Sequence, residues 1–64
     1  FKILYCKDHC LVYQRESIIC AVNLGDYAYF VEGIHGKQIY ASTPTRNHPL
    51  GLVIPAHGFS VYQI

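Results

Sequence analysis

Apolar residues occur along this chain in short runs, separated by polar or turn-forming residues. The runs are rich in β-branched and aromatic side chains, which favour strands, and Gly, Pro, Asn and Asp lie between them. No stretch repeats its apolar residues every 3.6 positions behind a capping residue, so nothing in the pattern indicates a helix. Seven strands are predicted, at residues 1–5, 10–14, 17–23, 27–34, 37–41, 50–54 and 59–64.

The connections between these runs indicate how the strands pair. A parallel crossover needs a dozen or more residues, so the short connections favour antiparallel neighbours. The longest connection, residues 42–49, is polar and can carry a Greek-key crossing. We therefore predict a single all-β domain over residues 1–64: a small antiparallel β-sandwich with Greek-key topology and about seven strands.

The third predicted strand is apolar on both of its faces. Ile18, Cys20 and Val22 share one face, and Ile19 and Ala21 share the other. We expect the first face to lie in the core, and the second to be exposed unless a partner covers it. The residues predicted for the core are Leu4, Leu11, Ile18, Cys20, Val22, Phe30, Ile39, Val53, Phe59 and Val61. Those predicted for an interface are Ile19, Tyr27, Tyr29 and Tyr62.

Composition supports the presence of a partner. The chain is 52% hydrophobic and 14% charged, whereas about a quarter charged is usual for a soluble domain. A domain of this size buries only about 60% of the surface of its unfolded chain, so apolar surface is left over. This surplus leaves a homodimer open as well as a partner domain. The net charge of +1 gives no electrostatic case for nucleic acid or an anionic membrane, and no apolar run approaches the ~20 residues of a membrane-spanning helix.

The three cysteines are best interpreted as free thiols. An odd number argues against a disulfide framework and favours a reducing compartment, so we predict a cytoplasmic location. Cys6, His9 and Cys10 are zinc-ligand types, but a structural zinc site needs four ligands in spaced pairs. We therefore interpret Cys6 and Cys10 as core residues beside a turn, and expect no metal and no cofactor.

No set of residues predicts catalysis. A Cys/His pair can form a nucleophile and its base, but here nothing orients the histidine. The carboxylates, Asp8, Glu16, Asp26 and Glu32, all fall at turns or strand ends. The six tyrosines are scattered over five predicted strands, which suits packing or an interface better than a sugar-stacking platform. A stand-alone carbohydrate-binding module that uses surface tyrosines remains the alternative function.

Three short motifs carry a resemblance. They are Tyr13-Gln14-Arg15, then Ala21-Val22-Asn23-Leu24, and the ending "LVIPAHGFSVYQI" at residues 52–64. Together they resemble the C-terminal all-β domain of the α-amylase family (glycoside hydrolase family 13), although Gly25 stands where that family usually has Ser. In that family the domain packs against a catalytic (β/α)8 barrel, which holds the catalytic carboxylates.

The resemblance implies a function for the chain. We expect a non-catalytic accessory domain from a longer glycoside hydrolase or glucosyl transferase of α-glucan or oligosaccharide metabolism. Its partner would be the barrel of the same parent chain, which would be the enzyme. No catalytic residue is expected within residues 1–64.

Asn23 ends an apolar strand, where its amide can both donate and accept hydrogen bonds. We predict that it bonds the backbone of the turn that leads to Tyr27. Gly25 and Gly58 are predicted to be turn glycines.

Overall fold

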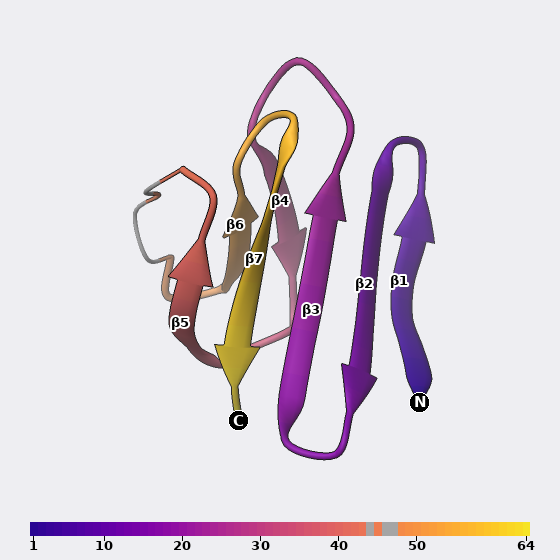
Figure 1. Ribbon diagram of the computed structural model, residues 1–64, viewed down its shortest axis with the longest axis vertical. Helices are drawn as coiled ribbons and strands as arrows, with labels where there is room; N and C mark the ends of the chain where they lie inside the picture. Colours follow the sequence, from indigo (N-terminus) through magenta and orange to yellow (C-terminus); the bar gives the residue numbers. More distant parts are fainter. Residues whose placement is uncertain (44, 46–47) are drawn as a thin grey trace.

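The computed structural model describes residues 1–43, 45 and 48–64, which form two antiparallel β-sheets (Figure 1). The strands are β1 (Lys2–Lys7), β2 (Cys10–Arg15), β3 (Ile18–Asn23), β4 (Tyr29–Glu32), β5 (Lys37–Ala41), β6 (Gly51–Ile54) and β7 (Gly58–Gln63). The five-stranded sheet has the order β1-β2-β3-β7-β5, and β4 and β6 form the second sheet. The all-β prediction is confirmed, and every predicted strand end lies within two residues of its observed position.

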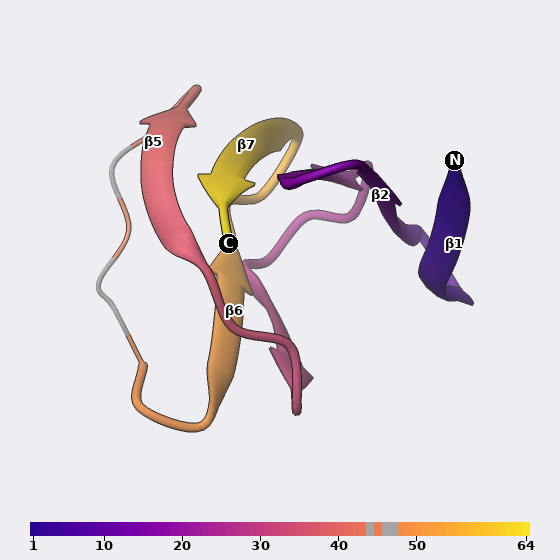
Figure 2. The ribbon, with the colours of Figure 1, turned by 90° about the horizontal axis from the view of Figure 1, so that it is seen from below.

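The first three strands are joined by tight turns, and the later connections cross between the sheets. Asp8 and Glu16 have left-handed backbone angles (φ 56° and 55°), as two-residue hairpin turns require. After β3 each strand lies in the opposite sheet from the one before it, so β7 returns to pair with β3. Figure 2 shows the result end-on, with β6 in a layer beneath β7. The result is a small antiparallel β-sandwich in which every connection after β3, including the one from β5 to β6, crosses from one sheet to the other.

The core lies between the two sheets and uses the opposite face of β3 from the predicted one. Ile19 and Ala21 are 1% and 0% exposed, whereas Ile18, Cys20 and Val22 are only half-buried on the far side. The full set of buried hydrophobic residues is Cys10, Val12, Ile19, Ala21, Val31, Leu52, Ile54 and Tyr62. The prediction that Ile19 and Tyr62 belong to an interface is therefore wrong.

None of the ten residues predicted for the core is fully buried. Phe30, Ile39 and Phe59 are exposed, and the other seven are half-buried. The physical reason is that alternation groups side chains by face without saying which face points inward. When both faces are apolar, the location of the second sheet decides.

Asn23 is a buried polar residue whose side chain links the two sheets. Its Nδ2 donates to Tyr27 O at 2.8 Å and to Ile54 O at 3.3 Å, while its Oδ1 accepts from Gly25 N at 2.9 Å. The side chain is 1% exposed, so these bonds lie in a shielded environment. The bond to the Tyr27 turn is the one expected from the sequence, and the bond to β6 was not foreseen.

The two predicted turn glycines occupy tight positions. A Cβ on Gly25 would approach Asn23 Oδ1 to 3.1 Å, so a side chain there would press on the capping amide. A Cβ on Gly58 would lie 2.2 Å from Ser42 Oγ, and that hydroxyl accepts a bond from Phe59 N. Both positions therefore favour glycine through close approach.

Both edges of the five-stranded sheet are irregular. The register shifts between Ile3 and Tyr5 in β1, and between Gln38 and Tyr40 in β5. Lysines stand at the strand ends, at Lys2 and Lys7 in β1 and at Lys37 in β5. Bulges and lysines are features that disfavour the pairing of an edge with another strand.

Candidate functional site

Exposed and half-buried apolar side chains gather on the face of the five-stranded sheet that points away from β4 and β6, which we call the outer face. Cross-strand partners place its side chains in three rows. The first row is Cys6, Leu11, Val22 and Phe59. The second row is Ile3, Tyr13, Cys20, Val61 and Tyr40. The third row is Arg15, Ile18, Gln63 and Lys37.

The first two rows carry no charged side chain. Ile3, Tyr40 and Phe59 are 56%, 55% and 44% exposed, and the residues between them are half-buried by their own neighbours. The rings of Tyr40 and Phe59 stack with centroids 5.4 Å apart. A hydrogen-bonding interaction with the Cys20 thiol raises the pKa of the Tyr13 phenol, with smaller contributions from the charge of Cys20 and from burial.

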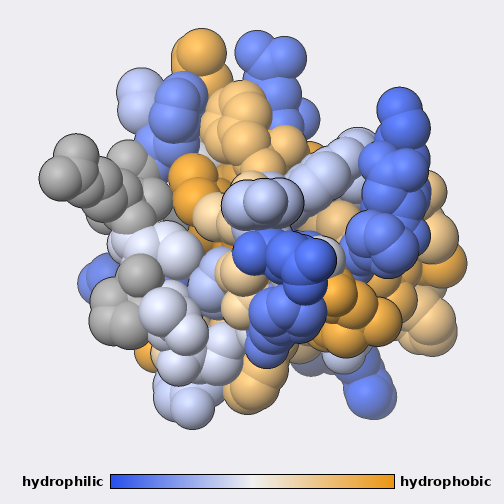
Figure 3. Space-filling view, turned by 90° about the horizontal axis from the view of Figure 1, so that it is seen from above, coloured by the Kyte–Doolittle hydropathy of each residue, from blue (hydrophilic) through white to orange (hydrophobic). Residues whose placement is uncertain are grey.

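Seen from above, the side of the molecule that carries β1 and β2 presents a stretch of hydrophobic surface (Figure 3). The position of Asn23 could have corrected the prediction of which face of β3 is buried, because Ile19, Ala21 and Asn23 alternate along the strand and share one face. A capping amide that bonds buried backbone must point inward, and Ile19 shares its face.

The tyrosines do not form a single platform. Tyr62 is buried, Tyr5 and Tyr29 bond each other through their hydroxyls, Tyr13 and Tyr40 lie on the outer face, and Tyr27 is 83% exposed in the β3–β4 loop. Of the predicted interface residues, Tyr27 is thus exposed and Tyr29 is half-buried. Among the described residues, only Tyr13 and Tyr40 share a row of the outer face, and they lie three strands apart.

The Cys6–His9–Cys10 cluster is divided by the strand pairing. Cys6 is exposed on the outer face, while Cys10 is buried on the inner side. The interpretation of Cys6 as a core residue is therefore wrong. Burial raises the pKa of the Cys10 thiol to about 11, with a smaller contribution from Cys6. Within residues 1–43, 45 and 48–64, no three potential ligands gather into a metal site.

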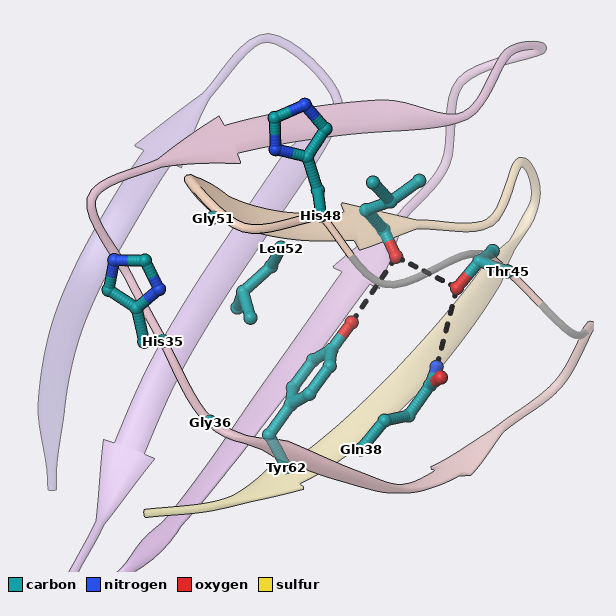
Figure 4. Close-up of a pocket in the computed structure, with 9 residues that line it drawn as sticks. His35, Gly36, Gln38, Thr45, His48, Gly51, Leu52 and Tyr62 are labelled. Carbon is teal, nitrogen blue, oxygen red and sulfur yellow. Dashed lines mark hydrogen bonds between the residues drawn. The ribbon is translucent and has the colours of Figure 1, made fainter.

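A small polar cavity of about 110 Å³ opens between the sheets near β5 and β6. Figure 4 shows its polar floor, where Tyr62 Oη and Thr45 Oγ1 both donate to Val53 O, at 3.3 and 3.2 Å. Gln38 Nε2 donates to Thr45 Oγ1 at 3.4 Å. These bonds join β5, β6 and β7, and the imidazoles of His35 and His48 also line the cavity.

No family model matches the sequence, and neither the search of curated proteins nor that of solved structures finds a match. In the part of the chain that the structure describes, no helix has the length and apolar character needed to cross a membrane.

Proposed function

We propose that this chain is a non-catalytic accessory domain that packs its outer face on the catalytic (β/α)8 barrel of an α-amylase-family enzyme in the same parent chain. The observation that carries the proposal is the outer face itself, whose first row spans four strands and second row five without a charged side chain. Such a continuous apolar surface typically marks a site of interaction. The family and its α-glucan or oligosaccharide substrates come from the resemblance of the Tyr13-Gln14-Arg15 and Asn23-Leu24 motifs.

The size of the outer face suits a contact within one chain. Strands of about six residues at ~3.3 Å per residue, five of them ~4.8 Å apart, give a face of about 20 by 24 Å. Covering it removes roughly 500 Å² from each side, or about 1,000 Å² in total. Interfaces between domains of one chain bury about 600–1,500 Å².

The same area is small for two separate molecules. Stable complexes bury about 1,200–2,000 Å². Covalent linkage raises the effective concentration of the second surface to the millimolar range, which lets a smaller interface persist. A barrel in the same chain is therefore better supported than a homodimer as the partner of the outer face.

Cysteine labelling in the full-length protein tests this proposal, because Cys20 lies in the second row of the outer face. We expect a maleimide to react with Cys20 at least tenfold more slowly in the native protein than in the isolated 64-residue chain. Val22→Asp, which places a charge beside Cys20, should abolish the protection. Leu24→Asp is the matched control, since Leu24 is 70% exposed and lies outside the three rows.

Two results would overturn the proposal. Equal labelling of Cys20 in the full-length protein and in the isolated chain would show that nothing covers the outer face. A coding sequence upstream of Phe1 without alternating strand and helix repeats would remove the barrel, and with it the assignment to this family.

A further inference from the structure

The third row of the outer face differs from the other two, because it has a cation near each end. Arg15 and Lys37 flank Ile18 and Gln63, and both charged side chains are exposed. Three strand spacings of ~4.8 Å separate β2 from β5, so the cations stand about 14 Å apart. Among the described residues, neither cation forms a salt bridge; the one recorded pair is His57 with Asp26, at 2.7 Å.

We propose that the partner surface carries carboxylates opposite Arg15 and Lys37, beside a flat apolar area that covers the first two rows. This inference rests on the proposed function and adds the chemistry and the direction of the docking. A purely apolar sheet face can be covered with its strands pointing either way. Two cations at one end of the strands fix the orientation of docking, because only one strand direction brings Arg15 and Lys37 to acidic groups on the partner.

The alternative occupant, a second copy of this chain, fits the charges poorly. Turning a second copy about an axis parallel to the strands brings Lys37 towards Arg15, and the like charges repel. Turning it about an axis across the strands lays the third row over Cys6, Leu11 and Val22, which offer no carboxylate. The row of cations therefore disfavours self-association while it favours an acidic partner.

Charge reversal in the full-length protein tests this inference, with the Cys20 labelling rate as the readout. Arg15→Glu and Lys37→Glu should each raise the rate about threefold to fivefold at low ionic strength, and 0.5 M salt should shrink the effect. Lys2→Glu is the matched control. It makes the same change of charge on β1, where the partner Gln14 lies on the inner face.

The outcomes separate this inference from the proposed function. One outcome is that Val22→Asp exposes Cys20 but Arg15→Glu and Lys37→Glu behave like Lys2→Glu. The outer face then docks on a partner, but the prediction of carboxylates on that partner is wrong. If the native protein does not protect Cys20 at all, the proposed function itself fails. If sedimentation shows a dimer that Arg15→Glu strengthens, the occupant is a second copy and the acidic partner is excluded.

Discussion

Replacing Asn23 by alanine should remove a large part of the stability of the domain. The change deletes three hydrogen bonds to backbone groups, namely those to Tyr27 O, Ile54 O and Gly25 N. Each such bond contributes about 0.5–1.5 kcal/mol, and a buried group left without a partner costs more. We therefore expect a loss of about 2–4 kcal/mol in the free energy of unfolding.

This loss is large for so short a chain. At about 0.05–0.15 kcal/mol per residue, 64 residues give a total stability of about 3–10 kcal/mol. With a urea dependence of about 1 kcal/mol per M, the midpoint should fall by about 2–4 M. Urea titration of the 64-residue chain, followed by circular dichroism, measures this shift directly.

Two further variants sharpen the test. Asn23→Asp keeps an acceptor for Gly25 N but cannot donate to the two carbonyls, so it should be at least as destabilising as alanine. Leu24→Ala removes an exposed side chain next to the same turn and should change the midpoint little. If Asn23→Ala moved the midpoint by less than about 0.5 M, the side chain would not be the connection between sheets that its geometry implies.

Two more changes have defined outcomes. Gly51→Ala should lower the free energy of unfolding by at least about 2–3 kcal/mol, since the added Cβ would lie 2.1 Å from Val31 O. Gly33→Ala should lower it by only about 1 kcal/mol, because no atom lies within 4 Å of the added Cβ but the φ of 88° disfavours any side chain. Urea midpoints that rank the two variants in reverse would contradict this. The folded pKa of Cys10, about 11, lies above the ordinary value of 9.0, so its contribution to stability is complete below pH 9 and is lost as the pH rises through 11. Melting temperatures between pH 8 and pH 11 should therefore fall less steeply in Cys10→Ala than in Cys6→Ala, and equal slopes would refute the assignment.

The ends of the strands could be predicted from the sequence because turn chemistry is local. Pairs such as Lys7-Asp8 and Arg15-Glu16 interrupt the apolar runs, and the structure turns within two residues of each. The same local logic led to Asn23, whose amide could be expected to cap the next turn. Its bond to Ile54 O joins residues 31 apart in sequence, and no local pattern could foresee it.

The direction of each face could not be predicted from periodicity alone. Ile18 and Ile19 are identical side chains on opposite faces of one strand, and the strand itself does not distinguish them. Burial was decided by β4 and β6, which cover the side with Ile19 and leave the side with Ile18 open. The surplus of apolar residues does leave apolar side chains exposed, but the prediction assigned the open face of β3 to the side of Ile19, which is buried.

The bulged edges of the five-stranded sheet have a consequence for how many molecules can associate. An assembly of molecules that pair sheet edge to sheet edge could grow without limit, because each added strand would offer a new edge. Register shifts in β1 and β5 oppose that route, while neither of the two sheets covers the outer face. A contact made face to face buries the outer face, so that surface cannot bind a further partner. If the outer face docks on a partner as we propose, that contact would saturate at one partner, with a fixed stoichiometry in place of a fibre.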